Sequence, residues 1–559
     1  MTQHRPDRNI PSSTSPFADP KALLAEAREH WRAGRIGDAE AIYRRLIAGR
    51  PEDPEPRYLL GSLYAQVARP ADAVAQLDAA VRLSPASAPL LNHYGRALVE
   101  AGRRVEAEAA FQRAIHLRVD FSEAHFNLGT LFRQDGRLAE AVAAYRRAAD
   151  ANPRALHVLI NLGITLQEMT AYDEAVKALH QAIAVDGHSF EAYYNLGGVL
   201  ASQRRLPEAA MAYQAAAGIN ARVAWVHVNL GFVLQELGQI EAAVAGYRRA
   251  IALAPDLAQA HINLGSALHQ QHDLQGSLAA VRRSIELEPR NARSQATLAQ
   301  TLREIGDFAG AEAAYRHVLE LEPGQPLAQA HLSILLQQTG RLEAAQELLD
   351  YDRLLRRHPL GHVKGWPSVP AFNADLARAI YEHPTLMPDP PGKATMRGSQ
   401  TLEFLHSDDP ALQMLRRLAE AAVSTYIDET VAAAPHLFPP PPDTRRLHGW
   451  GVVLRSGGHQ SAHFHPAGIV SGVYYVRVPA VVRRGQDGDA GCIRFGEPEP
   501  GLASTHKPPG RFVTSVRPEE GLMILFPSYF WHQTIPFESD EDRICIAFDL
   551  LKDPARQAD

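Results

Sequence analysis

Cysteine is almost absent from this chain, which has only Cys492 and Cys545 in 559 residues. A disulfide framework is therefore excluded, and a reducing compartment such as the cytoplasm is favoured. The chain also lacks any apolar run long enough to span a bilayer, so we expect no membrane partner. Charge of one sign is not in excess, because 57 basic and 63 acidic residues leave a net charge of −6. That balance gives no reason to expect nucleic acid as a partner.

The length predicts more than one domain. A chain of 559 residues exceeds one ordinary hydrophobic core, so we expect at least two domains. Residues 1–19 are polar and contain proline, without the apolar centre of a signal peptide, and we expect them to be disordered. Residues 553–559 are expected to form a tail. The composition indicates no particular oligomeric state.

A repeat of 34 residues runs through the first two thirds of the chain. Leucine–glycine or tyrosine–glycine pairs recur at this interval, with glycines at Gly61, Gly95, Gly129, Gly163, Gly197, Gly231 and Gly265. A second series of small residues has the same period, at Ala39, Ala73, Ala107, Ala141, Ala175, Ala209, Ala243, Ser277, Ala311 and Ala345. Small residues let paired helices approach closely, and prolines such as Pro51 and Pro85 stop each pair. The pattern therefore predicts antiparallel helix pairs.

This pattern resembles the tetratricopeptide repeat, as in "AHFNLGTLFRQDGRLAEAVAAYRRAADANP" (124–153). Ten repeats are predicted over residues 20–353. The resemblance implies an α-solenoid, a tetratricopeptide superhelix with a concave binding surface.

A series of asparagines bears on the ligand of this surface. They lie two residues before the repeat glycine, at Asn127, Asn161, Asn195, Asn229 and Asn263. Stacking should align them as a ladder, and an amide can both donate to and accept from the backbone of an extended peptide. The repeats resemble those of O-linked N-acetylglucosamine transferase, in which a similar ladder grips substrate peptides. The alternative is that the asparagines bond neighbouring repeats and stabilise the stack.

The pattern changes after the repeats. We expect a linker over 354–372, helices near 373–383 and 409–430, and one folded domain over 373–552. From Leu447 onward, short β-rich runs separated by turn residues predict an all-β sandwich or barrel. The expected strands are 447–454, 469–478, 492–495, 511–516, 522–526 and 543–551.

The stretch "SAHFHPAG" (461–468) places His463 and His465 two residues apart. On an extended segment the two rings would point to one face. A metal site with open positions needs a third ligand from another strand, and His532 in "FPSYFWHQTIPF" (526–537) is the candidate. His459 is four residues from His463, which is poor strand spacing. Arg543 is the first residue of the final expected strand, and its guanidinium group can bind a carboxylate with two parallel hydrogen bonds.

The order of these residues resembles the Fe(II)/2-oxoglutarate-dependent oxygenases. The closer match is a bacterial and phage subgroup, here represented by Trp450, "HFHP" (463–466), "SGVYYV" (471–476), "FPS" (526–528), His532 and Arg543. The resemblance implies an α+β domain with a double-stranded β-helix, or jelly-roll, core. It also implies Fe(II) on His463, His465 and His532, with 2-oxoglutarate and O2 as co-substrates.

The resemblance further implies that Arg543 holds the distal carboxylate of 2-oxoglutarate. Of the two adjacent tyrosines, Tyr475 is preferred as a partner of the co-substrate, because a regular strand would place it on the face of Ser471. Cys545 stands where a hydroxyl is common, and His465 stands where most members have a carboxylate.

Plainer interpretations exist for some of these residues. Arg543 could form an ion pair with Asp540 or Asp542. Trp450 and Trp531 are expected to pack in the core.

Three functions are compatible with the sequence. The first is a dioxygenase that hydroxylates a protein or peptide recruited by the repeats. The second is an oxygenase of a small molecule or natural product, with the repeats as an assembly module. The third is a non-catalytic protein-binding scaffold. The complete set of three histidines and Arg543 argues against the third, and the asparagine ladder favours the first over the second.

Overall fold

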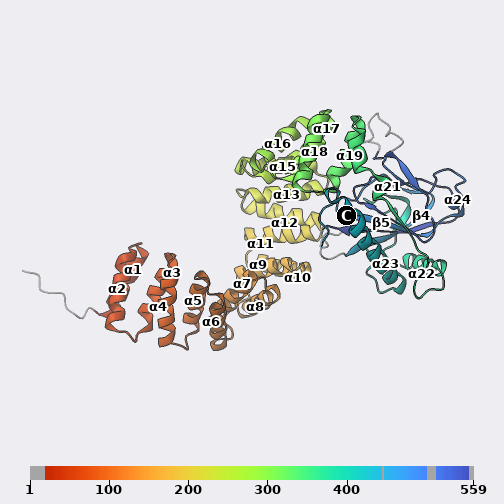
Figure 1. The fold of residues 1–559 in the computed structure, drawn as a ribbon. Coiled ribbons are helices and arrows are strands. Elements are labelled where there is room, and N and C mark those ends of the chain that lie inside the picture. Colours follow the sequence, from red (N-terminus) through yellow and green to blue (C-terminus); the bar gives the residue numbers. More distant parts are fainter. Residues whose placement is uncertain (1–18, 443–445, 500–511, 553–559) are drawn as a thin grey trace, which may run out of the picture. The chain divides into compact units, whose positions relative to one another are not determined.

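A computed structural model describes residues 19–442, 446–499 and 512–552 (Figure 1). The segments expected to be a disordered N-terminus and a C-terminal tail lie outside these residues, except for Asp19, whose carboxylate caps the first helix. The chain forms two compact units, Met1–Ala254 and Pro255–Asp559. No helix among the described residues is long and apolar enough to cross a membrane.

The first unit consists of antiparallel helix pairs in the predicted 34-residue register. Its helices are α1 (Pro20–Arg32), α2 (Ile36–Gly49), α3 (Pro54–Gln66), α4 (Pro70–Leu83), α5 (Ala88–Glu100), α6 (Arg104–Leu117), α7 (Ser122–Gln134), α8 (Leu138–Ala151), α9 (Leu156–Glu168), α10 (Tyr172–Val185), α11 (Phe190–Ser202), α12 (Leu206–Ile219), α13 (Ala224–Glu236) and α14 (Ile240–Leu253). The stacked pairs confirm the helical solenoid.

The repeat glycines lie where two paired helices come closest. In α11, a Cβ added at Gly197 would lie 2.8 Å from the ring of Tyr213 in α12. The small residues of the second series are also buried, as Ala209 is in α12. The repeated small residues in the sequence thus mark the positions at which paired helices are in contact.

The second unit begins with the same pairing and then changes architecture. Its repeat helices are α15 (Ala258–Gln270), α16 (Leu274–Leu287), α17 (Ala292–Ile305), α18 (Phe308–Leu321), α19 (Pro326–Gln338) and α20 (Leu342–Leu348), followed by the short helix α21 (Tyr351–Leu354). All later strands pair antiparallel.

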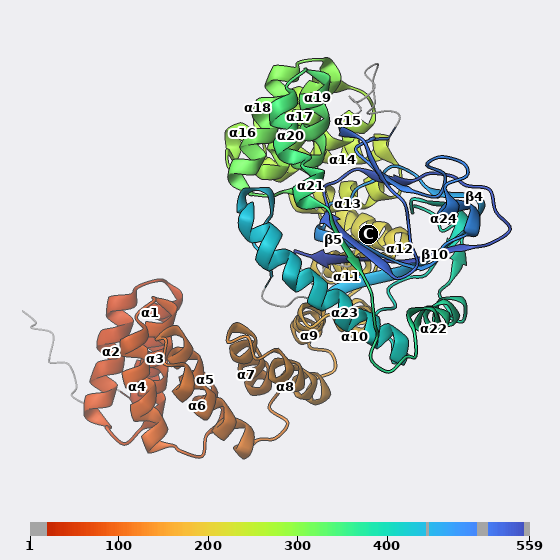
Figure 2. The same cartoon turned by 45° about the vertical axis from the view of Figure 1, so that its right-hand side comes forward.

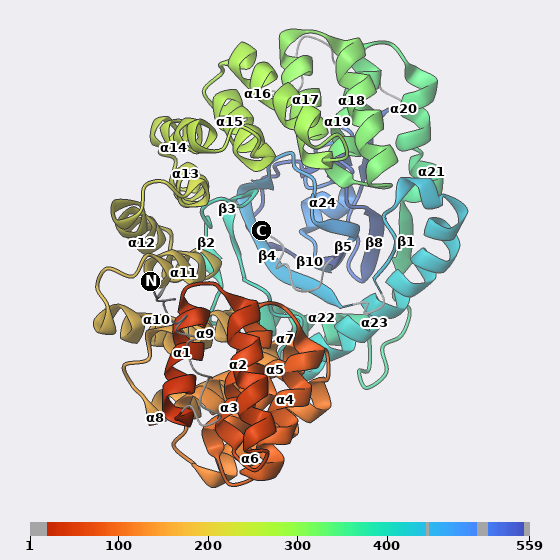
Figure 3. The same ribbon diagram turned by 90° about the vertical axis from the view of Figure 1, so that its left-hand side faces the viewer.

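Two sheets make up the β domain. The larger has the order β1-β8-β5-β10-β4-β3-β2 (Figure 3). The smaller has the order β7-β6-β9. The strands are β1 (Arg356–Pro359), β2 (Met387–Pro388), β3 (Thr395–Gln400), β4 (Leu447–Gln460), β5 (Gly468–Arg477), β6 (Ile493–Phe495), β7 (Thr514–Val516), β8 (Leu522–Pro527), β9 (His532–Thr534) and β10 (Arg543–Leu551). From β5 onward the chain crosses repeatedly between the sheets, with β5, β8 and β10 in the larger and β6, β7 and β9 in the smaller, which is compatible with a jelly-roll core.

The expected linker contributes to this domain. Residues 356–359 form β1, which pairs with β8 in the register Arg356↔Leu525. The run "RRHP" carries no strand pattern of its own, and it is held by backbone hydrogen bonding to an apolar neighbour. The short strands β2, β3 and β9 were not expected either. β3 and β9 pair with strands that are distant in sequence, and the two-residue β2 pairs with β3.

The helices α22 (Val369–Tyr381) and α23 (Pro410–Tyr426) lie on one side of the large sheet (Figure 2). Their bounds are close to those of the two expected helices, 373–383 and 409–430. The Tyr474 hydroxyl of β5 donates to Asn373 Oδ1 of α22 at 2.7 Å. Adjacent residues on a strand face opposite ways, so Tyr475 points into the domain.

The last repeats share a core with the β domain. The indole N–H of Trp531 donates to the Ala330 carbonyl of α19 at 3.3 Å. The ring of His331 meets those of Phe464 and Trp531 edge to face. The Tyr529 hydroxyl donates to the Leu348 carbonyl at 2.7 Å. The final repeat helices are therefore part of the hydrophobic core that supports the β domain.

Candidate metal centre

Three histidines meet between the two sheets. Their ring centroids are separated by 4.3 Å for His463 and His532, 5.1 Å for His465 and His532, and 5.2 Å for His463 and His465. One nitrogen from each ring lies within 4.8 Å of the other two. This spacing suits three ligands of one metal ion.

The segment that carries His463 and His465 differs from the expected strand. It lies between β4 and β5, and only His463 forms an isolated bridge, with His532. The backbone N–H groups of His463 and His532 donate to each other's carbonyls at 3.0 and 2.9 Å, and the His465 N–H donates to the Ser528 carbonyl at 2.9 Å. These backbone hydrogen bonds, rather than the alternation of side chains along a strand, bring the rings of His463 and His465 together.

Hydrogen bonds leave the same ring nitrogen free in all three histidines. His463 Nδ1 lies 2.7 Å from the Ser461 carbonyl, and His532 Nδ1 lies 2.9 Å from the Phe530 carbonyl. His465 Nδ1 lies 2.6 and 2.7 Å from the two carboxylate oxygens of Asp549. Carbonyl and carboxylate oxygens only accept, so each Nδ1 carries the proton. Each Nε2 is therefore an unprotonated donor for a metal.

Burial reinforces this state. It lowers the pKa of His463 to about 4 and the pKa of His532 well below the usual range, and the neighbouring imidazoles act in the same direction. Both rings are therefore neutral at pH 7, as a metal ligand must be.

Arg543 lies on the inner face of β10 in fully buried surroundings. Its side chain is 1% exposed, and its Nε donates to the Gly491 carbonyl at 3.2 Å. The alternative interpretation, an ion pair with Asp540 or Asp542, is not found among the described residues, and Asp542 instead accepts from the Tyr381 hydroxyl. Within residues 19–442, 446–499 and 512–552, Arg543 has no carboxylate partner.

Tyr475 and Cys545 surround this guanidinium. Arg543 lies over the Tyr475 ring at 5.1 Å from its centroid and donates to Cys545 Sγ at 3.6 Å. The Tyr475 hydroxyl is buried without a hydrogen-bond partner in the described part of the chain. Burial raises the pKa of both the Tyr475 phenol and the Cys545 thiol, so both stay protonated at pH 7.

These residues fit the groups that the sequence resemblance implies. Three imidazoles with free Nε2 atoms and hydrogen-bonded Nδ1 atoms are a donor set for a transition metal such as Fe(II). A buried guanidinium without a counterion and an unsatisfied buried hydroxyl fit one carboxylate of a dicarboxylic acid.

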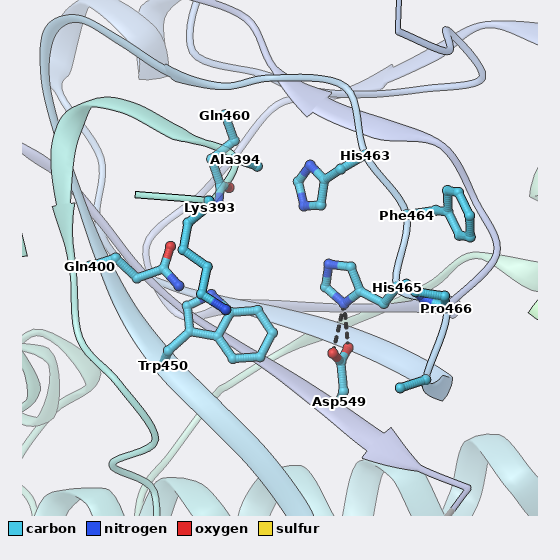
Figure 4. Close-up of a pocket in the computed structure, with 12 residues that line it drawn as sticks. Lys393, Ala394, Gln400, Trp450, Gln460, His463, Phe464, His465, Pro466 and Asp549 are labelled. Carbon is cyan, nitrogen blue, oxygen red and sulfur yellow. Dashed lines mark hydrogen bonds and ion pairs between the residues drawn. The ribbon is translucent and has the colours of Figure 1, made fainter. Parts of the chain in front are cut away.

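A cavity of about 250 Å³ adjoins two of the histidines (Figure 4). Its wall includes His463, His465 and Asp549 on one side, and Lys393, Gln400 and Trp450 on the other. Trp450 is only part-buried in this wall, although it packs against the hydrophobic core as expected. Trp531 is buried at the contact with α19, as expected.

Sequence reasoning missed Asp549. Its signal was a lone acidic residue inside the apolar strand "RICIAFDLL", six residues after Arg543 and therefore on the same face. His459, which was set aside because of its spacing, lies outside the cluster and faces the Gly457 carbonyl.

The asparagine series divides into two kinds of contact. Asn127 donates to Asn92 Oδ1 and Asn229 donates to the Tyr194 hydroxyl, both in the preceding repeat. Asn161 and Asn195 donate only to carbonyls of their own helices. Asn263, in the second unit, is buried and accepts from Gln259.

Comparison with known families gives two kinds of match. The family described as "Putative 2OG-Fe(II) oxygenase" matches residues 448–549. Families described as tetratricopeptide or TPR repeats match residues 24–88, 95–155, 160–222, 233–272 and 302–351. No curated protein matches the chain.

Several solved structures are similar to part of the chain. MamA is 25% identical over 30% of this chain and 97% of its own, with a TM-score of 0.28. YrrB, described as a TPR protein with an unusual peptide-binding site, is 20% identical over 34% and 96%, with a TM-score of 0.31. Pseudomonas aeruginosa PilF is 19% identical over 38% and 97%, with a TM-score of 0.34.

The family matches cover both parts of the fold in chain order, and the histidine cluster lies inside the oxygenase match. The chain is therefore a tetratricopeptide-repeat protein whose C-terminal part matches the family described as "Putative 2OG-Fe(II) oxygenase".

Proposed function

We propose that this chain is a Fe(II)/2-oxoglutarate-dependent dioxygenase that hydroxylates a protein or peptide recruited by its repeats. The observation that carries the proposal is the histidine cluster, in which every Nδ1 is hydrogen-bonded and every Nε2 is left for a metal. A non-catalytic scaffold would not need three neutral imidazoles aligned in this way.

The residues have distinct roles in this proposal. His463, His465 and His532 would hold Fe(II), and Arg543 would bind the distal carboxylate of 2-oxoglutarate. The Tyr475 hydroxyl would donate to the same carboxylate, which would satisfy a group that is otherwise unpaired. With O2, iron and 2-oxoglutarate supply the oxidising power for hydroxylation of a C–H bond, and 2-oxoglutarate becomes succinate and CO2.

The size of the cavity supports a side chain as the substrate. Pockets that enclose drug-sized molecules usually have volumes of roughly 300–1,000 Å³. The cavity beside His463 and His465 has a volume of about 250 Å³, which suits one side chain better than a natural product.

The repeats supply polar groups that could hold the rest of a polypeptide. Asn161 and Asn195 are partly exposed, and their Oδ1 atoms have no partner among the described residues. A peptide backbone N–H could donate to each of them.

Turnover of 2-oxoglutarate tests the catalytic part of the proposal. Purified protein with Fe(II) and 2-oxoglutarate should form succinate, and His532→Ala should abolish this because it removes one of three ligands. His459→Ala is the matched control and should retain turnover, since His459 is near in sequence but outside the cluster. Equal succinate formation by wild type and His532→Ala would refute the metal assignment.

Partner capture tests the role of the repeats. Changing Asn161, Asn195 and Asn229 together to Ala should reduce recovery of cross-linked protein partners on a His532→Ala background, as counted by mass spectrometry. The control changes Asn152 and Asn220 to Ala, because these asparagines only cap turns between helices. Undiminished capture by the triple variant would assign the series to stacking of the repeats.

A further inference from the structure

Asp549 is a buried acidic residue in the described part of β10, and it faces His465. Both of its carboxylate oxygens lie within 2.7 Å of His465 Nδ1, and the residue is 1% exposed. Its only basic side-chain partner among the described residues is that imidazole. A buried carboxylate is costly without such a partner, so its position needs an explanation.

Two serines from the sequence motifs hold this carboxylate. The Ser471 hydroxyl of "SGVYYV" donates to Asp549 Oδ1 at 2.6 Å. Since that proton is used, the Ser528 hydroxyl of "FPS" is the donor in its 2.9 Å contact with Ser471. A chain of hydroxyls therefore points toward Asp549, beside the His465 N–H. These hydrogen bonds hold the carboxylate in place against His465 Nδ1.

His465 differs in this respect from the other two histidines. The Nδ1 atoms of His463 and His532 donate to neutral backbone carbonyls, whereas that of His465 donates to a carboxylate. The three proposed ligands are neutral imidazoles, and a carboxylate lies directly behind one of them, His465.

We propose that Asp549 is a positioning residue that gives His465 the donor strength of an acidic ligand. Three neutral imidazoles would leave Fe(II) with two uncompensated charges, and the Asp549 carboxylate reduces this to one through the shared proton of His465. Ser471 and Ser528 keep the carboxylate in line with Nδ1. This inference rests on the proposed iron site.

Metal affinity tests the role of Asp549 without requiring turnover. Under anaerobic conditions, Asp549→Asn should raise the Kd for Fe(II) by about 10–100-fold, because the change keeps an acceptor oxygen but removes the charge. Loading with Co(II) provides a spectroscopic readout, since a weaker histidine donor should shift the visible ligand-field bands. A purely structural role for Asp549 would change unfolding of the metal-free protein but leave these bands in place.

Glu403→Gln is the matched control. Glu403 is a carboxylate 3.5 Å from Nδ1 of His448, another histidine–carboxylate pair, and it does not line the cavity. Its Fe(II) Kd and Co(II) spectrum should match those of the wild type.

The outcomes separate this inference from the proposed function. If the wild type binds Fe(II) and Asp549→Asn binds it within twofold, with an unchanged Co(II) spectrum, the role of Asp549 is overturned. If the wild type and His463→Ala bind equally poorly, the iron site itself fails. If Asp549→Asn does not fold, the Ser471→Ala variant is measured in its place. A Kd for Fe(II) and a Co(II) spectrum of Ser471→Ala equal to those of the wild type would overturn the proposal.

Discussion

Two adjacent tyrosines in β5 have hydroxyls in opposite situations. The Tyr474 hydroxyl is buried and donates to Asn373, whereas the Tyr475 hydroxyl is buried with no partner among the described residues. An unsatisfied buried polar group costs about 1–3 kcal/mol, while a satisfied one contributes about 1 kcal/mol. The two side chains therefore predict opposite effects of the same substitution.

Tyr475→Phe should stabilise the protein without 2-oxoglutarate by about 1 kcal/mol, because it removes the unpaired hydroxyl. Tyr474→Phe should destabilise it by a similar amount, because Asn373 loses its donor. Urea denaturation measures both. The KM for 2-oxoglutarate should rise only in Tyr475→Phe, and a rise in both variants would contradict the placement of Tyr475 at the co-substrate.

At the candidate metal centre, the sequence predicted which residues take part. It did not predict which hydrogen-bond acceptor each histidine would have. The three histidines and Arg543 stand out by spacing. Whether a histidine donates Nδ1–H to a carbonyl or to a carboxylate depends on which side chain lies behind it, as Asp549 does for His465.

At the scale of single elements, the paired repeat helices depend on how closely their backbones approach. Gly197 and Gly198 are adjacent in α11 but lie in different environments. A Cβ at Gly197 would lie 2.8 Å from the buried Tyr213 ring, whereas a Cβ at Gly198 would be 3.5 Å from the hydroxyl of that tyrosine.

Gly197→Ala should destabilise the protein by about 1–3 kcal/mol, because the Tyr213 ring has no room to move. Gly198→Ala should stabilise it by up to about 1 kcal/mol, because alanine is the better helix former and its contact is ordinary. Thermal unfolding followed by circular dichroism gives both signs. Destabilisation of equal size in the two variants would show that the contact with Tyr213 is not the cause.

Elements with a hydrophobic pattern of their own were predicted closely. Elements that are ordered only by pairing with another strand were not. The strands β4, β5, β8 and β10 are apolar runs and were expected. β1, with the sequence "RRHP", exists only because β8 offers a free edge. The His463–His465 segment is held in the same way, by backbone bonds to His532 and Ser528.

At the scale of the whole second unit, the final repeat and the β domain are joined through His331. This residue continues the register of the asparagine series, but it stacks on Tyr315 and meets Phe464 and Trp531. Phe464 lies between His463 and His465, and Trp531 precedes His532. The last repeat therefore supports both segments that carry the histidine cluster.

Burial lowers the pKa of His331 to about 4, and the nearby Arg303 acts in the same direction. Above pH 6.5 the ring is neutral in both the folded and the unfolded chain. As pH falls from 6.5 to 4 the unfolded chain binds the proton and the folded chain does not, so the free energy of unfolding falls by up to about 1.4 kcal/mol per pH unit.

Replacing His331 with Phe should reduce this pH dependence, because the ring is kept and the titrating group is removed. The measurement is the guanidinium midpoint at several pH values from 7.5 to 5, followed by tryptophan fluorescence. The buried His463 and His532 also have lowered pKa values, so part of the dependence should remain. An equal slope in the wild type and in His331→Phe would exclude His331 as a contributor.

Periodicity alone was enough to identify the helix pairs, because small residues every 34 positions mark contacts between neighbours in sequence. Ordered motifs were enough to select His463, His465, His532 and Arg543. Contacts between residues distant in sequence carry no such pattern. Only the tertiary structure shows that Asp549 is hydrogen-bonded to His465, that "RRHP" forms a strand of the larger sheet, and that His331 joins the repeats to the β domain. In each case the partner is chosen by three-dimensional packing and by the need of a buried polar group for a counterpart.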